Sequence, residues 1–324
     1  MKKFFCFAAA LILLGMVVSC KKESNQVLIF SSSEDFRIEH MQKRLNEQFP
    51  QYSVVINYMT TGNLAAKLKA EGTATDCDIV GEMDYAYLEG ILDSLADLSS
   101  YDSSMFLDEL IPEHHKYFPL YKNAGCIAIN EKFLADRGLP VPSSYADLIK
   151  PEYKGMISMP SPKSSGTGYL FLKNLVNVWG EDAAFAYFDK LAENILQFTS
   201  SGSGPVNALI QGEAGIGLGM TMQVAAAVNR GSTLKAVFFD EGSPYSMYGT
   251  GIIKGKETRQ AVREVFEFYY TTLSREDKEL FVPEQIFKSQ TNAIANYPVN
   301  TKPADMRGIE NLAEKERLLD KWKY

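Results

Sequence analysis

Residues 27–59 read VLIFSSSEDFRIEHMQKRLNEQFPQYSVVINYM, and this stretch indicates the fold class. It opens with an apolar run at 27–30, which favours a buried strand. A helix follows, because apolar residues recur at helical spacing, at Ile38, Met41, Leu45 and Phe49. After Pro50 ends that helix, the β-branched segment 53–59 predicts a second strand. A helix that joins two strands in this way predicts a parallel pair with a right-handed crossover.

The same alternation of strand and helix continues along the chain. A loop at 60–63, a helix at 64–71 and a strand from residue 78 complete a βαβαβ unit. The alternation restarts later, with strands expected at 125–129, 155–159, 195–198, 215–218 and 234–239. We therefore predict an α/β protein with two doubly wound lobes joined by a hinge. The first lobe is expected to comprise 27–121 plus about 247–324 and the second lobe 122–246, with crossing segments at 121–125 and about 241–248.

The first twenty residues, MKKFFCFAAALILLGMVVSC, have the pattern of a secretory signal. Two lysines precede an apolar run, and small residues lead into a cysteine. The end of the run resembles the lipobox of bacterial lipoproteins, which implies that residues 1–19 are removed and that Cys20 receives acyl chains. A single membrane-spanning anchor is the alternative, although the run is short for that role. We expect a protein of the cell envelope, with a tether at 20–26, held by lipid on a bacterial membrane and facing the periplasm or the exterior.

Composition limits the classes of partner. The chain has 324 residues, 46% hydrophobic and 12% aromatic, which fits an ordered globular protein. Its net charge of −7 argues against nucleic acid, which requires a basic face. Beyond the predicted signal and Cys20, two cysteines remain, Cys77 and Cys126, and they could form a disulfide or stay as buried thiols. The charged segment 310–323 is expected to form a solvent-exposed helix.

Four loops rich in serine, threonine and glycine follow predicted strands, and each leads into a helix. Ligands of open α/β sheets bind beyond the carboxyl ends of the strands. Helix N-termini there offer free N–H groups and partial positive charge, so these loops could hold an anion, although each could equally be an ordinary helix cap. The candidate ligand-binding residues are Ser32, Ser33, Thr61, Gly62, Ser165, Gly166, Thr167, Ser200 and Ser201, together with Glu241 near the second crossing segment.

Four segments carry a resemblance to a known family. They are LIFSSS at 28–33, PSSYADLIKPEYKGMISMPSPKSSGTGY at 142–169, ALIQGEAGIGLGM at 208–220 and VFFDEGSPYSMYGTGIIKG at 237–255. Together they resemble the extracellular solute-binding proteins of ABC importers, in the group that contains ferric-iron, phosphonate and sugar-phosphate binders. The resemblance implies a type II periplasmic-binding fold, a ligand held between two lobes, and delivery to an ABC permease and its ATPase. It implies no cofactor and no catalysis, and we expect a monomer.

The subgroup determines the expected ligand. Iron binders of this group carry adjacent tyrosines after the helix and strand of the segment that corresponds to 208–220, but at the matching place this chain reads Met220-Thr221-Met222-Gln223. We therefore expect no metal and instead a small anionic or zwitterionic solute, such as a phosphonate or an organic phosphate. The alternatives are a ferric-iron-binding protein, a secreted two-lobed enzyme and a sensor lipoprotein. No G-x-S-x-G nucleophile motif and no H-E-x-x-H motif occurs in the sequence, which argues against the enzyme.

Overall fold

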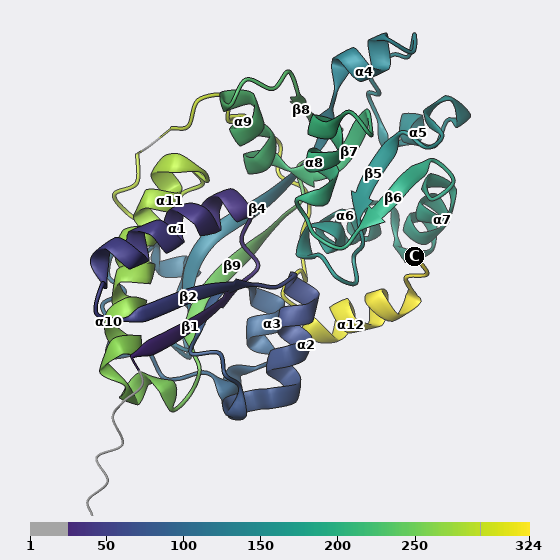
Figure 1. Ribbon diagram of the computed structural model, residues 1–324. Helices are drawn as coiled ribbons and strands as arrows, with labels where there is room; N and C mark the ends of the chain where they lie inside the picture. The colour runs from purple at the N-terminus through teal and green to yellow at the C-terminus, as the bar shows by residue number, and fades with distance from the viewer. Residues whose placement is uncertain (1–24, 292) are drawn as a thin grey trace, which may run out of the picture.

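The computed structural model describes residues 25–291 and 293–324, and it has two α/β lobes that share one curled sheet (Figure 1). The predicted signal and the lipidation site at Cys20 lie outside the described residues. The strands follow the order β2 (Ser53–Tyr58), β1 (Gln26–Ser31), β3 (Ile79–Asp84), β9 (Tyr245–Ile252), β4 (Phe118–Ile129), β7 (Ile216–Met220), β5 (Ile157–Pro160) and β6 (Ile195–Thr199). The short strand β8 (Lys235–Val237) pairs with β4. The predicted fold class, two α/β lobes joined by a hinge, is confirmed.

The first lobe is built on three parallel strands, as the βαβαβ pattern predicts. These are β1 (Gln26–Ser31), β2 (Ser53–Tyr58) and β3 (Ile79–Asp84). Its helices are α1 (Asp35–Gln48), α2 (Thr61–Glu71), α3 (Tyr85–Glu89), α10 (Gln260–Phe268) and α11 (Ser274–Leu280), and the π-helical turn η6 (Tyr269–Leu273) joins the last two. The parallel pairing places the carboxyl ends of β1 and β2 at one edge, next to the beginnings of α1 and α2.

The second lobe repeats this architecture. Its strands are β5 (Ile157–Pro160), β6 (Ile195–Thr199), β7 (Ile216–Met220) and the short β8 (Lys235–Val237). Its helices are α4 (Glu131–Ala135), α5 (Tyr145–Leu148), α6 (Gly166–Trp179), α7 (Glu181–Leu191), α8 (Gly204–Gln211) and α9 (Thr221–Asn229). The strand β7 is buried along its whole length, and a Cβ on Gly217 or Gly219 would crowd Leu209 or Val206 of the neighbouring helix, at 3.2 and 2.7 Å.

Two antiparallel strands form the hinge, β4 (Phe118–Ile129) and β9 (Tyr245–Ile252). The first part of β4, up to Ala124, pairs with β9, and the part from Gly125 onward pairs with β7 of the second lobe. A single continuous strand therefore belongs to both lobes. The change of partner along β4 falls between Ala124 and Gly125, inside the segment 121–125, and β9 begins at Tyr245.

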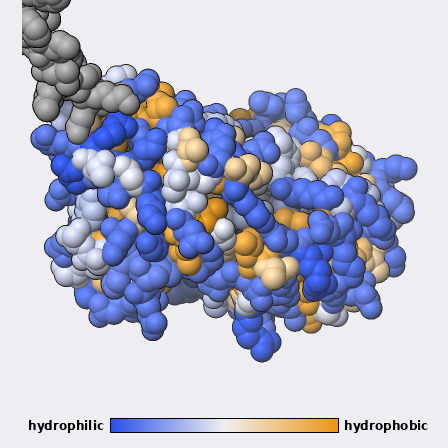
Figure 2. Space-filling view, turned by 90° about the horizontal axis from the view of Figure 1, so that it is seen from below, coloured by the Kyte–Doolittle hydropathy of each residue, from blue (hydrophilic) through white to orange (hydrophobic). Residues whose placement is uncertain are grey.

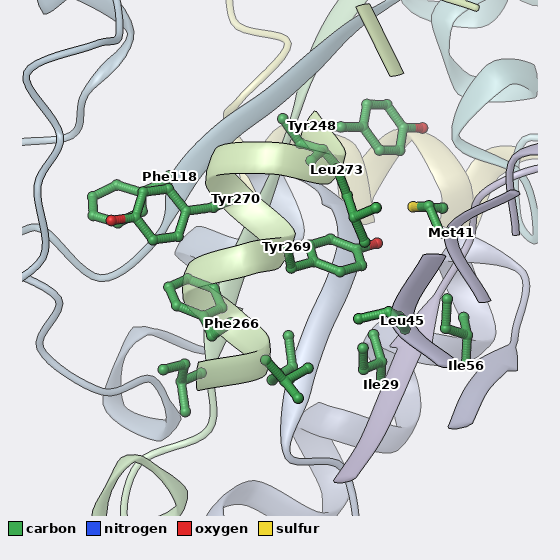
Figure 3. Close-up of a cluster of buried hydrophobic side chains, with 14 of the residues drawn as sticks. Ile29, Met41, Leu45, Ile56, Phe118, Tyr248, Phe266, Tyr269, Tyr270 and Leu273 are labelled. Carbon is green, nitrogen blue, oxygen red and sulfur yellow. The ribbon is translucent and has the colours of Figure 1, made fainter. Parts of the chain in front are cut away.

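Each lobe has a large hydrophobic core of its own. In the first lobe, Ile29 of β1 and Ile56 of β2 pack against Leu45 of α1 (Figure 3). Phe266 of α10 and Tyr270 of η6 belong to the same core. The rings of Phe118 and Tyr270 are 4.9 Å apart between centroids. A core side chain of this size contributes about 1.5–3 kcal/mol by leaving water. The buried apolar side chains of α10 thus belong to the core of the first lobe.

The C-terminal segment lies across both lobes, which differs from two expectations. The buried residues Ala304, Met306, Ile309, Leu318 and Trp322 belong to the core of the second lobe, although the sequence analysis grouped 247–324 with the first. The last helix, α12 (Leu312–Lys321), also contacts α3 of the first lobe. Expecting this helix to be solvent-exposed was wrong for one face, because Lys315 is 2% exposed and Leu318 is fully buried. Lys315 finds its charge partner in Asp84, 231 residues away in the sequence, at 2.5 Å.

Two surface and chemical properties bear on function. Seen from below, the molecule is largely hydrophilic, and its apolar residues form small groups (Figure 2). No helix in the described ranges is long and apolar enough to cross a bilayer. Cys77 and Cys126 are both buried as free thiols, in different hydrophobic clusters. Burial raises the pKa of the Cys126 thiol to about 12, so it is unreactive in the folded protein.

Candidate functional site

A cavity of about 250 Å³ lies between the two lobes at the carboxyl ends of β1, β2 and β6. Its first wall consists of Ser32, Ser33, Glu34, Asp35, Tyr58 and Thr60, and its second wall of Ser200, Ser201, Gly202, Ser203 and Asn207. We call this cavity the cleft. Its place at the strand ends is where α/β folds hold ligands.

Three helices begin at the cleft. The first turns of α1 and α2 lie behind the first wall, and the first turn of α8 lies behind the second. Each helix leaves unpaired N–H groups and a partial positive charge at its start. The hydroxyl of Thr60 is buried and has no hydrogen-bond partner among the described residues. The cleft can therefore donate several hydrogen bonds to an anionic group without any lining cation.

A buried network fixes the first wall. The hydroxyl of Ser33 donates to Glu82 Oε2 at 2.5 Å, and the guanidinium of Arg37 donates to the same oxygen at 2.9 Å. Arg37 also donates to Glu34 at 3.0 Å and to Asp277 at 2.7 Å. Arg37 is 1% exposed, so its charge is balanced by these carboxylates and not by water. These hydrogen bonds therefore fix the positions of Ser33 and Glu34 in the first wall of the cleft.

The charges of this network do not cancel. Its members are the acids Glu34, Glu82 and Asp277 and the bases Arg37 and Lys278, whose ammonium donates to Asp277 at 3.0 Å. One carboxylate is in excess. Burial, reinforced by the nearby Glu82 and opposed by Arg37, raises the pKa of Glu34 to about 7. Protonation of Glu34, which lines the cleft, would therefore make the network electrically neutral.

The candidate residues at the starts of α2 and α6 lie where the lobes touch, and they do not line the cleft. The backbone N–H of Gly62 donates to the carbonyl of Ser164 at 3.1 Å, across the two lobes. Ser165 caps α6, since its hydroxyl accepts from the N–H of Gly168 at 3.4 Å. The hydroxyl of Thr167 accepts a 3.2 Å bond from the side chain of Asn123 in the hinge.

Two further candidates sit close to this contact. A Cβ atom on Gly166 would meet the hydroxyl of Tyr248 at 2.0 Å, so only glycine fits there. Thr61 is buried beside the same tyrosine. These glycines and hydroxyls therefore allow the first turns of α2 and α6 to approach the hinge.

The remaining candidate, Glu241, lies elsewhere. It sits in the turn between β8 and β9, close to Tyr145 and Tyr187 in the second lobe. Burial, with a smaller contribution from the carboxylate of Glu241, raises the pKa of Tyr145. Of the ten candidates, Ser32, Ser33, Ser200 and Ser201 line the cleft.

Seven residues that line the cleft were not among the ten candidates chosen from the sequence. They are Glu34, Asp35, Tyr58, Thr60, Gly202, Ser203 and Asn207. Thr60, Gly202 and Ser203 lie inside the serine, threonine and glycine loops expected from the sequence, and Glu34, Asp35 and Tyr58 lie within two residues of those loops. Asn207 could have been found from helical spacing, since it lies four residues after Ser203 on α8.

Another cavity, of about 390 Å³, lies beside the hinge strands. Lys122 and Tyr245 line it, as do Glu284 and Tyr297 from the segment after α11. It is not at the end of parallel strands from both lobes, and we therefore place the candidate site in the cleft. Within the described ranges, no three His, Cys, Asp or Glu side chains gather in a way that could hold a metal ion.

Comparison with known proteins identifies a family and related folds. The sequence model of a family described as bacterial extracellular solute-binding protein matches residues 53–279. An uncharacterized protein of Haemophilus influenzae is 27% identical over 290 residues, covering 84% of this chain and 80% of that protein. The spermidine/putrescine-binding periplasmic protein of Escherichia coli is 23% identical over 278 residues, covering 81% and 77%. The structure of the periplasmic binding protein AfuA from Actinobacillus pleuropneumoniae, with fructose-6-phosphate bound, has a TM-score of 0.81 at 23% identity, covering 92% of this chain and 97% of AfuA.

Proposed function

Because the chain belongs to the family of bacterial extracellular solute-binding proteins, we propose that its cleft captures a small anionic or zwitterionic solute for an ABC importer. A phosphate, phosphonate or carboxylate group is the anion that the cleft suits. The observation that carries this proposal is the convergence of hydroxyl-rich loops and three helix N-termini, from both lobes, on one cavity.

Capture would proceed by closure of the two lobes about β4 and β9. A solute that touches both walls binds the closed form better than the open form, and it therefore shifts the population toward closure. The ligand is not chemically changed, since members of this family bind and release solutes. The closed protein then delivers the solute to the permease and its ATPase.

The relatives support the ligand class in different ways. AfuA holds a sugar phosphate, and the Escherichia coli relative binds polyamines, as their names state. AfuA supports the proposal that a fold of this kind can hold a ligand with an anionic phosphate group. The Escherichia coli relative is relevant because the first wall of the cleft contains two acids, Glu34 and Asp35.

A thermal-shift screen tests the proposal. The panel contains phosphonates, sugar phosphates, phosphoglycerates, amino acids and ferric citrate. A true ligand at a hundred times its Kd should add about 2.7 kcal/mol to the free energy of unfolding, which is easily measured. A melting shift with ferric citrate alone, together with a visible charge-transfer absorption band, would contradict the proposal and favour the iron-binding alternative.

We also propose the lipid anchor at Cys20, on the lipobox alone. The test is to grow cells with labelled palmitate and to compare the wild type with Cys20→Ser. The wild type should carry the label and sediment with membranes, whereas the variant should lose both properties. Label on the variant would contradict the assignment of Cys20.

A further inference from the structure

The two walls of the cleft differ in charge. The first carries Glu34 and Asp35 beside the ring of Tyr58. The second consists of three serines, a glycine and an asparagine, so none of its residues carries a charge. A ligand that bridges the walls therefore meets carboxylates at one end and hydroxyl and N–H groups at the other.

The buried network behind the first wall places the uncompensated negative charge of that wall on Glu34. Glu34 is 6% exposed, and among the described residues its carboxylate accepts a side-chain hydrogen bond from Arg37. The charged groups that face it are Arg37 on α1 and Glu82 on β3, with Asp35 next to it in the sequence and the phenol of Tyr58 on β2 opposite. Arg37 is already committed to Glu82 and Asp277. One negative charge of the network thus remains for a cation in the cleft to balance.

We propose that the captured solute carries a protonated amine, which lies against Glu34 while the anionic end of the solute lies against the serine loop 200–203. This inference rests on the proposed function and names its substrate class, a zwitterionic amine. A cation at Glu34 replaces the proton that otherwise neutralises the network. Tyr58, a residue that is 44% exposed, offers the amine an aromatic ring, and cations bind favourably to the faces of such rings.

Proton linkage gives the first test. Glu34, with a pKa of about 7, is half protonated at pH 7, so an ammonium that binds beside it should release about half a proton per ligand. Calorimetric titration in two buffers of different ionisation enthalpy measures that number. Glu34→Gln should abolish the release, because the amide does not titrate. Proton uptake at Glu34 would instead show that the anionic end of the ligand lies there, and it would overturn the inference.

A matched pair of probes gives the second test. Phosphoethanolamine is compared with ethyl phosphate, and β-alanine with propionate, so that each pair differs only in the amine. The wild type should prefer at least one amine over its partner by tenfold or more, and Glu34→Gln should lose that preference. Asp35→Asn should reduce the preference for the amine less than Glu34→Gln does. Because Asp35 is exposed, this variant cannot act through misfolding of the core. Glu39→Gln, an exposed residue further along α1, is the matched control and should leave it unchanged.

The outcomes separate the two proposals. If the deaminated probes bind as tightly as the amines, the inference is overturned and the proposed function stands. If only a diamine such as putrescine binds, the amine site stands and the anionic site fails. If no probe of either kind binds, both proposals fail.

Discussion

The backbone N–H of Gly62 in α2 bonds to the carbonyl of Ser164, just before α6, and this bond joins the first turns of two helices from opposite lobes. The contact occurs where a Cβ on Gly62 would lie 2.5 Å from the carbonyl oxygen of Lys163. Closure of the lobes thus depends on small residues at the tips of these helices. A substitution at the neighbouring Gly166 can test whether closure of the lobes requires a small residue there.

Replacing Gly166 with alanine should hold the lobes apart. The new Cβ would meet the hydroxyl of Tyr248 at 2.0 Å but its ring carbon only at 3.3 Å. Gly166→Ala should therefore weaken solute binding by tenfold or more and increase the radius of gyration of the ligand-loaded protein, measured by small-angle X-ray scattering. Tyr248→Phe in the same chain removes the clashing oxygen and should restore most of the compaction. A double variant as open as the single one would refute the steric explanation.

Ser201→Ala should lower the affinity for the solute. Its hydroxyl lines the cleft and lies 3.1 Å from the hydroxyl of Ser203. A lost hydrogen bond of this type costs about 0.5–1.5 kcal/mol, which corresponds to roughly two- to tenfold in Kd. Calorimetric titration measures the change. Ser289→Ala, at an exposed position far from the cleft lining, is the control and should bind as the wild type does.

The stability of the solute-free protein should fall as the pH rises through 7. Glu34 has a folded-state pKa of about 7 against an ordinary value of 4.5. Below pH 4.5 it is protonated in both states and imposes no penalty, whereas above pH 7 the folded protein must bury its charge. Urea unfolding at a series of pH values from 5 to 8 should show this decline in the wild type and a smaller decline in Glu34→Gln. An equal slope in both proteins would contradict the assignment to Glu34.

Removal of Lys315 should destabilise the protein strongly. Its ammonium pairs with Asp84 at 2.5 Å, and both side chains are 3% exposed. Lys315→Met would leave a buried, unpaired carboxylate, at a cost of about 3–5 kcal/mol. Asp84→Asn in the same chain should recover much of that loss, because the amide oxygen can still cap α3 at the N–H of Tyr87. Urea denaturation of the single and double variants measures the recovery, and a double variant weaker than Lys315→Met would contradict this explanation.

The two internal cysteines should resist thiol reagents until the protein unfolds. Cys77 and Cys126 are free, and each is at most 2% exposed. Ellman's reagent should therefore modify neither thiol in the folded protein and both in urea. Intact mass without a reducing agent distinguishes the alternative, since a disulfide would lower the mass by about 2 Da and block both reactions.

Local periodicity was sufficient to predict most of the fold. The apolar spacing in residues 27–59 places a helix between two strands, and the chain repeats that pattern often enough to imply two lobes. The cleft was harder to predict, because its first wall depends on contacts between distant parts of the chain. Arg37 and Asp277 are 240 residues apart, so no local pattern indicates that Glu34 lies in a buried network. The burial of Lys315 had the same cause, since its partner is in β3.

The continuity of β4 has a consequence for how affinity can change. The chain has no flexible loop at this crossing, so opening and closing must bend a hydrogen-bonded ribbon whose residues from Phe118 to Ile129 belong to both lobes. The elastic stiffness of that ribbon sets the energy difference between the empty and the loaded shape. Substitutions along β4 that touch no cargo can therefore retune the strength of capture, and they offer a way to adapt this scaffold as a sensor for a chosen concentration range.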